Sequence, residues 1–161
     1  LKSESGLSGI LKNYDINDFL KDLRKGKNLA EISIEYFDKN TVIPLLSEWY
    51  RVLKTGGVLR IAVPNFEIIA RLYLSGDYPL ENFIGPLYGR MPMGDTTIYH
   101  KHVYDFKTLK NLLSTCHFKD CRLYDWRDTE HRDFDDHSQA YLPHMDKENG
   151  TLVSLNVECN K

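Results

Sequence analysis

The clearest hydrophobic pattern in the chain is an apolar helix face between residues 41 and 54. Its members recur at intervals of three and four residues, as the buried stripe of an amphipathic helix does. Thr41 is the expected N-cap, and Pro44 fits the first turn, where backbone amides have no helical partner. Gly56 and Gly57 favour a left-handed stop after the helix. The apolar positions are Val42, Leu45, Leu46, Trp49, Val52 and Leu53.

Two predicted strands flank this helix. Apolar and polar residues alternate over residues 29–37, which is typical of a half-buried strand. Residues 58–63 form a short apolar run closed by Pro64, which we interpret as a buried strand, and a helix is predicted over 67–74. Because strand, helix, strand and helix follow one another, the order favours a parallel sheet in an α/β fold.

The remaining segments complete a single predicted domain over residues 1–161. Glycine and proline are frequent from residue 75 onward, so we expect an irregular, lid-like insertion at about 75–104. A helix is predicted over 105–116, and strands over 121–126 and 152–157. The polar segment between these two strands is rich in His, Asp and Tyr.

Composition and charge narrow the classes of partner and compartment. The formal net charge of -2, without a dense basic stripe, argues against nucleic acid as a partner. No run of 18 apolar residues and no secretion signal is present, so we expect a cytoplasmic protein without a membrane anchor. The three cysteines are odd in number and contain no C-x-x-C pair, so we expect neither a disulfide framework nor a thiolate metal site.

One segment carries a family resemblance. Residues 48–66, EWYRVLKTGGVLRIAVPNF, resemble the E-x-x-R-V-L-K-P-G-G-x-L-x-I-x-V-P segment of class I S-adenosylmethionine-dependent methyltransferases. Shorter matches are Glu35-Tyr36-Phe37 and Tyr14-Asp15-Ile16, and residues 124–158 are similar to predicted methyltransferases of surface-polysaccharide gene clusters. The resemblance implies a Rossmann-like class I methyltransferase fold with a mainly parallel sheet, an antiparallel final strand and an incomplete N-terminal part.

The chain departs from this family at its cofactor loop. The family binds the methionine part of S-adenosylmethionine with a glycine-rich E/D-x-G-x-G-x-G loop, where bare backbone can approach the ligand. That loop and an acidic residue for the ribose have no counterpart in these 161 residues. Either the chain is a truncated or cofactor-free relative, or segments of the parent protein are absent from the sequence.

The resemblance implies S-adenosylmethionine as cofactor and methyl transfer to a small molecule or sugar. Asp15 and the amide of Ile16 would contact the adenine, and Ser33 and Glu35 would border the cofactor. For Asp15, a turn or helix-cap role is the alternative. His100 or His131 would be the acceptor-side base. The expected substrate-binding residues are Tyr88, His102, Tyr104, Trp126, Arg127, Tyr141 and His144, each with a structural hydrogen-bonding role as the alternative.

Two other functions and a dimer are compatible with the sequence. A methyltransferase-like domain without catalysis would bind a partner through the same face. His100, His102, Asp135 and His137 could instead bind zinc, iron or manganese, although their spacing matches no known site. Aromatic residues between Tyr73 and Tyr88 suggest a homodimer contact, and burial within the insertion explains them equally well.

Overall fold

In the computed structural model, the described residues are 34–93 and 95–161. They begin with a short 3₁₀ helix, η3 (Ile34–Tyr36), followed by helix α3 (Lys39–Val52). Residues 29–33 of the predicted first strand lie outside the described residues, and 34–36 are helical. The strand prediction is therefore wrong over its described part. A 3₁₀ turn can bury Ile34 as a strand would, so the apolar position alone did not distinguish the two structures.

Helix α3 confirms the predicted apolar face but begins earlier than expected. Asp38 is its N-cap, and the carboxylate accepts hydrogen bonds from the amides of Asn40 at 2.9 Å and Thr41 at 3.1 Å. These hydrogen bonds also lower the pKa of Asp38. The chain turns after the helix at Gly56, whose φ of 75° lies in the left-handed region that glycine adopts freely.

The described sheet has three strands in the order β1–β7–β4, with bounds β1 (Val58–Pro64), β4 (Lys119–Leu123) and β7 (Ser154–Asn160). Both neighbours of β7 pair with it antiparallel. The predicted mainly parallel, Rossmann-like sheet is therefore wrong, and β1, expected to be central, lies at one edge of the described sheet. An apolar run such as residues 58–63 is buried equally well in either orientation, so it could not reveal the direction of its neighbour.

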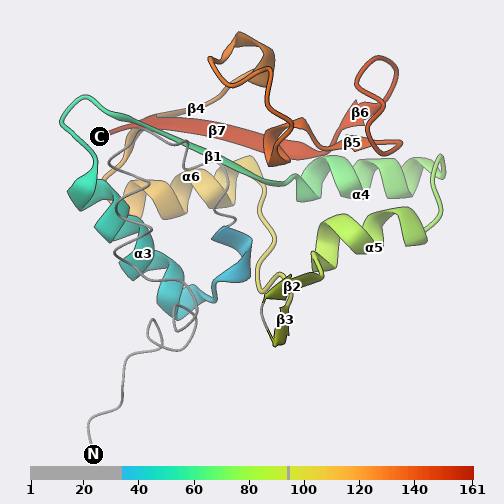
Figure 1. The fold of residues 1–161 in the computed structure, drawn as a ribbon, viewed down its shortest axis with the longest axis horizontal. Helices are drawn as coiled ribbons and strands as arrows, with labels where there is room; N and C mark the ends of the chain where they lie inside the picture. Colours follow the sequence, from blue (N-terminus) through green and yellow to red (C-terminus); the bar gives the residue numbers. More distant parts are fainter. Residues whose placement is uncertain (1–33, 94) are drawn as a thin grey trace, which may run out of the picture.

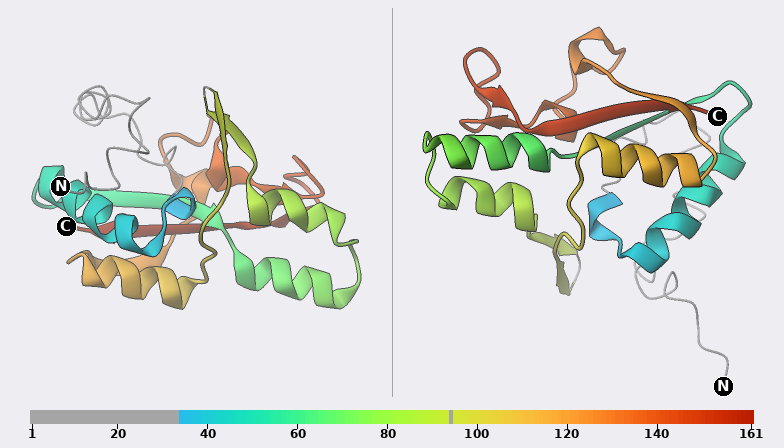
Figure 2. Two further views of the ribbon diagram at one scale, coloured as in Figure 1. Left: turned by 90° about the horizontal axis from the view of Figure 1, so that it is seen from below. Right: turned by 180° about the vertical axis from the view of Figure 1, so that it is seen from behind.

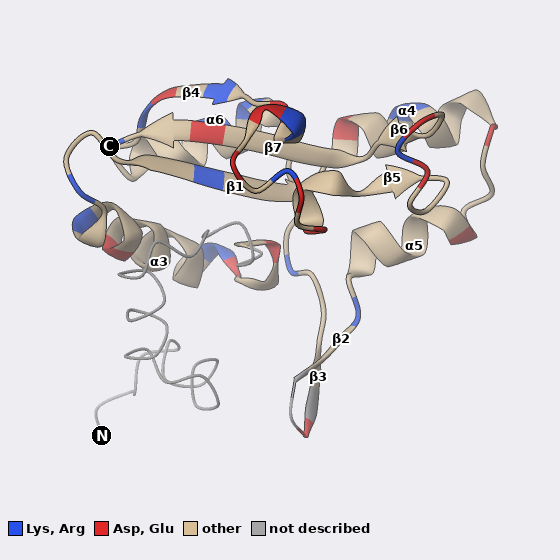
Figure 3. Cartoon of the chain, turned by 45° about the horizontal axis from the view of Figure 1, so that its top comes forward, with Lys and Arg blue, Asp and Glu red and all other residues tan. Residues whose placement is uncertain are grey.

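Cross-strand charges match the register of this sheet. Glu158 of β7 lies opposite Arg60 of β1 and Arg122 of β4. Its carboxylate contacts the Arg60 guanidinium at 3.0 Å and that of Arg122 at 2.7 Å. Opposite charges facing each other across strands stabilise pairing, whereas a shift by one residue would turn them to the other face. Figure 3 shows basic and acidic positions side by side on β1 and β7.

The main core lies between one face of this sheet and two helices, α3 and α6 (Phe106–Thr115). Figure 1 shows both helices on the same side of the sheet, with the loops of residues 124–150 on the other side. The core is formed by the inward-facing side chains of α3, α6 and the three strands. Its fully buried members include Leu46, Trp49, Leu59, Ile61, Leu109, Leu113 and Val157.

The expected irregular insertion contains regular structure. Helix α5 (Glu81–Tyr88) lies within it. It packs beside α4 (Phe66–Ser75), which confirms the helix predicted over 67–74 and begins at the N-cap Asn65, as both views of Figure 2 show for the pair. A small antiparallel hairpin follows, β2 (Met91–Met93) with β3 (Thr96–Ile98). A second cluster of Ile69, Phe83, Leu142 and Val153 joins the helices to the loops, because the two helices are too short to bury their apolar faces alone.

Of the aromatic residues proposed for a dimer contact, the structure buries one and exposes two. Phe83 is buried, while Tyr73 and Tyr88 are 51% and 59% exposed. The fourth, Tyr78, is half-buried. The homodimer stays a prediction.

Short elements organise the long segment between β4 and β7. They are the 3₁₀ helices η4 (Trp126–Asp128) and η5 (His137–Gln139), and the antiparallel pair β5 (Tyr141–Leu142) and β6 (Thr151–Leu152). The amide of Val153 donates to the carbonyl of Ala140, and that of Asn65 donates to the carbonyl of Val153, both at 2.8 Å. The loops are therefore tied to the end of β1.

Two further observations concern the cysteines and the membrane. Cys121 of β4 and Cys159 of β7 form a disulfide, while Cys116 is free and buried. The expectation of no disulfide is contradicted, because sequence spacing did not show that β4 and β7 would be neighbours. Across the described ranges, no helix combines the length and apolar character needed to cross a lipid bilayer.

Candidate functional site

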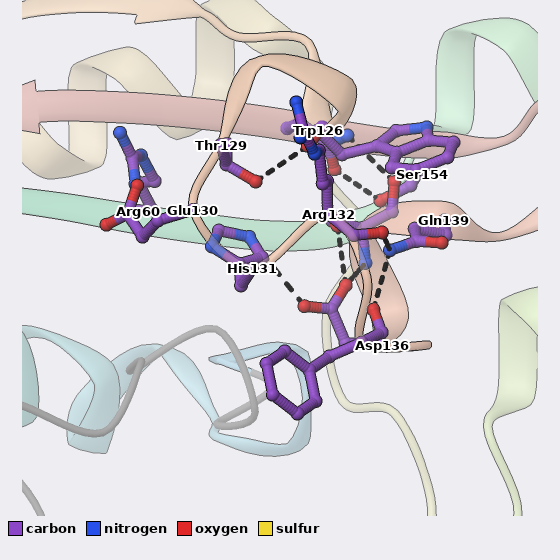
Figure 4. Close-up of polar contacts among 12 residues, drawn as sticks. Arg60, Trp126, Thr129, Glu130, His131, Arg132, Asp136, Gln139 and Ser154 are labelled. Carbon is purple, nitrogen blue, oxygen red and sulfur yellow. Dashed lines mark hydrogen bonds and ion pairs between the residues drawn. The ribbon is translucent and has the colours of Figure 1, made fainter.

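A buried histidine beside a carboxylate is the central feature of the loops above the sheet. Nε2 of His131 lies 3.8 Å from Oδ2 of Asp136, and the two side chains are only 4% and 11% exposed. Neither ring nitrogen of His131 has a hydrogen-bond partner among the described residues. Figure 4 shows His131 directed at the Asp136 carboxylate.

The other oxygen of Asp136 is fixed by η5. Oδ1 accepts from the amide of Ser138 at 2.8 Å and from its hydroxyl at 2.5 Å. The carbonyl of Ser138 accepts in turn from the Asn156 side chain at 2.9 Å. Asn156 belongs to β7, so the sheet holds Asp136 in place and leaves Oδ2 toward His131.

Three of the predicted substrate-binding residues lie together. The hydroxyl of Tyr141 accepts from Nε1 of Trp126 at 3.2 Å and from the Arg127 guanidinium at 2.9 Å. Arg127 and Lys147 both lie over the Trp126 ring, at 4.7 Å and 5.4 Å from its centroid. Trp126 and Tyr141 are buried, so this cluster primarily braces the loops.

An open pocket of about 250 Å³ lies at the surface of these loops. Asp136 forms part of its wall, and His144, one of the predicted substrate-binding residues, forms another part. Trp126, Arg127 and Tyr141 do not line it. The complete lining is Asp135, Asp136, His137, Gln139, Ala140, His144 and Met145.

The second candidate base, His100, also lies beside a carboxylate. Its Nε2 is 3.5 Å from Oε1 of Glu35, and the two side chains are 8% and 4% exposed. The backbone carbonyl of Glu35 accepts from the amides of Lys101 and His102, at 2.7 and 3.2 Å. The segment after β3 is thereby joined to η3.

The position of His100 is set by the end of α5. Gly89 ends that helix with a φ of 51°, and a Cβ at residue 89 would collide with the imidazole. Tyr36 donates to the carbonyl of Gly89 at 2.6 Å and meets the His100 ring edge-on. Burial, with the nearby charge of His137, lowers the pKa of His100, although the carbonyls of Leu87 and Pro86 act in the opposite direction. His100 is therefore held as a packed side chain.

The other predicted substrate-binding residues do not share one site. Tyr104 is buried, its ring stacks on His102, and burial with the Glu35 charge raises the pKa of its phenol. The backbone of Tyr104 bridges Asn65, so it joins the end of β1 to the segment before α6. Tyr88 is exposed at the end of α5.

Of the four residues predicted to contact S-adenosylmethionine, the structure describes only Glu35. Asp15, Ile16 and Ser33 lie outside the described residues. Glu35 is described, but its carboxylate is buried beside His100 and its carbonyl accepts two backbone amides.

The metal hypothesis also finds no support in the part of the chain that the structure describes. No group of three or more His, Cys, Asp or Glu side chains there has an arrangement that could hold a metal ion. His100 lies beside the Glu35 carboxylate, whereas the ring of His102 stacks on Tyr104.

Sequence reasoning missed the residues that support Asp136. Ser138 and Asn156 are buried, and Ser154 donates to the Asn156 side chain at 2.7 Å. The sequence D-x-S at 136–138 is a signal for a side chain that bonds its own backbone two residues on. No comparable signal indicated that Asn156 of β7 would take part.

No protein-family model matches the chain, and no curated protein matches its sequence.

Proposed function

We propose that this chain takes part in S-adenosylmethionine-dependent methyl transfer to a small molecule or sugar, with cell-surface glycan biosynthesis as its context. The observation that supports this proposal is the buried His131 directed at Asp136, a carboxylate on the wall of the pocket. The resemblance of residues 48–66 supplies the reaction class. The described residues would form the acceptor side only.

The chemistry on this side is removal of a proton. A hydroxyl loses its proton as its oxygen is methylated, and an ammonium has to lose one before its nitrogen can attack the methyl group. A positioned base assists that loss. An acceptor in the pocket would donate a hydrogen bond to Asp136, the carboxylate at the wall. His131, behind it, would take up the proton, because imidazole is more basic than a carboxylate in water.

His131 is a better candidate for this role than His100. The imidazole of His100 packs against Gly89, and its carboxylate neighbour Glu35 does not line the pocket, whereas Asp136, the neighbour of His131, does. Its contact with Glu35 joins η3 to the end of α5, so we assign His100 to positioning of the insertion.

Substitution of His131 tests the proposal. With methyl-labelled S-adenosylmethionine and a panel of neutral and amino monosaccharides, we expect His131→Gln to reduce transfer by about a hundredfold or more, a typical contribution of general-base catalysis. His117→Gln is the matched control, because His117 is exposed on the turn after α6, and it should retain the wild-type rate.

Two results would contradict the proposal. One is a His131→Gln variant that is folded and as fast as the wild type; the other is a wild-type chain that labels no member of the panel. Calorimetry with S-adenosylhomocysteine then separates the alternatives, since an enzyme binds this product while a non-catalytic binding module does not.

A further inference from the structure

The pocket beside η5 has a one-sided charge distribution. Two of its seven lining residues, Asp135 and Asp136, are carboxylates, and no lysine or arginine lines it. Lys147 contacts two lining residues and is already engaged by them, because its Nζ lies 3.0 Å from Oδ1 of Asp135 and 2.6 Å from Oε1 of Gln139. Asp135 is therefore paired with Lys147, whereas the second carboxylate of the pocket contacts no lysine or arginine within the described residues.

That carboxylate is Asp136, and its position is fixed. The hydrogen bonds from Ser138 hold Oδ1, while Oδ2 faces His131 across 3.8 Å, too far for a hydrogen bond. His131 is buried, and both of its nitrogens lack a hydrogen-bond partner within the described ranges. Within the described ranges Oδ2 accepts no hydrogen bond, whereas Oδ1 accepts two, so a ligand that donates hydrogen bonds at Oδ2 would complete this edge of the pocket.

The rest of the lining defines the frame of such a ligand. Met145 and Ala140 supply apolar surface, and Met145 is 48% exposed. Gln139, His137 and His144 supply polar groups around it. A ring or short chain with hydroxyl groups suits this mixture, and an anionic group would meet the two carboxylates.

We infer that the pocket binds a small hydroxylated molecule through a protonated amine, as in an amino sugar, with the ammonium on Asp136. The inference rests on the proposed function in naming the acceptor class, but binding in the pocket can be measured without cofactor or methyl transfer. An ammonium donates three hydrogen bonds and neutralises the free carboxylate, which a hydroxyl cannot do.

Titrations of the full chain followed by NMR test this inference. The probes are D-glucosamine, D-glucose and D-glucose 6-phosphate at neutral pH, without S-adenosylmethionine. We expect D-glucosamine to bind about tenfold more tightly than D-glucose, since a hydrogen bond to a charged group contributes more than a neutral one. D-glucose 6-phosphate should bind more weakly than D-glucose because of repulsion by the carboxylates.

The variants assign the binding to the pocket. Asp136→Asn should remove the preference for the amine, and Asp135→Asn should weaken it while releasing Lys147. Asp133→Asn is the control, because Asp133 is exposed and outside the pocket. Because Asp135 is exposed, its variant keeps the test valid if Asp136→Asn fails to fold.

The outcomes separate this inference from the proposed function. Equal affinity for D-glucosamine and D-glucose, or an amine preference that a folded Asp136→Asn variant retains, overturns the inference whatever the transfer assay shows. If Asp136→Asn does not fold, an amine preference that is unchanged in Asp135→Asn overturns it instead. An amine preference that depends on these carboxylates, in a chain that transfers no methyl group, supports the inference and contradicts only the proposed function.

Discussion

Single carboxylates define where two of the helices begin. Asp38 caps α3, and Asp105 caps α6 by accepting from the amide of Thr108 at 2.7 Å and from its hydroxyl. The hydrogen bonds from Thr108 lower the pKa of Asp105. The ionised form is thus the stabilising one, and it satisfies amides that have no partner within the helix.

Removal of the Asp105 cap should reduce stability by a measurable amount. We expect Asp105→Ala to lower the free energy of unfolding by about 1 kcal/mol in urea denaturation at neutral pH, while Asp105→Asn, an equally good cap, stays close to the wild type.

The pH dependence of this effect has a defined sign. Because the folded pKa lies below the ordinary value of 3.8, the contribution is present above that value and is lost as the pH falls through the folded pKa. A difference between wild type and Asp105→Ala that does not diminish as the pH is lowered through the acid range would contradict this explanation.

At the residue scale, the sequence supplied candidate side chains but did not show which of them contact one another. His131 and Asp136 lie close in sequence, and both were part of the predicted polar segment. The contact of Glu35 with His100 could not be predicted. The two residues are far apart in the sequence, and α5 and the β2–β3 hairpin, which lie between them in the chain, bring them together. The sequence predicts Thr41 as the N-cap of α3, whereas in the structure Asp38 accepts hydrogen bonds from the amides two and three residues after it.

At the scale of elements, the apolar periodicity of helices was the reliable signal. The predicted helix over 105–116 is α6, whose Leu109 and Leu113 are fully buried against the sheet. The strand predicted over 58–63 is confirmed as β1. The strand predicted over 29–37 is wrong at residues 34–36, which form a 3₁₀ turn. Over so few residues, alternation of apolar and polar positions does not distinguish a strand from such a turn.

The packing of α6 gives a quantitative expectation. Leu109→Ala should lower the free energy of unfolding by about 2–5 kcal/mol, because it removes buried methyl groups and leaves a cavity. Leu123→Ala is the control: Leu123 is 60% exposed at the end of β4, and its change should stay within about 0.5 kcal/mol. Similar losses in both variants, measured by chemical denaturation, would mean that the α6 face is not part of the core.

At the scale of the whole molecule, strand direction escaped prediction. Nothing in residues 58–63 specifies whether the neighbouring strand is parallel, and the order of strands and helices suggested a crossover that the described sheet lacks. The partner of β1 comes from the far end of the chain and runs in the opposite direction. The same topology brings Cys121 and Cys159 together on adjacent strands.

A thiol count tests this topology directly. The chain has three cysteines, of which Cys116 alone is free. Oxidised protein unfolded without reductant should therefore react with one equivalent of thiol reagent, and with three after reduction. Replacing both Cys121 and Cys159 by Ala should lower the free energy of unfolding by roughly 3–4 kcal/mol, since the bond closes a loop of 38 residues. Three thiols before reduction would contradict the pairing.

The central place of β7 has a consequence during synthesis. Because the sheet forms around residues 154–160, a nascent chain still attached to the ribosome cannot complete it until this segment has left the exit tunnel. Until then β1 and β4 expose unsatisfied backbone groups, the state in which chaperones protect growing polypeptides from one another.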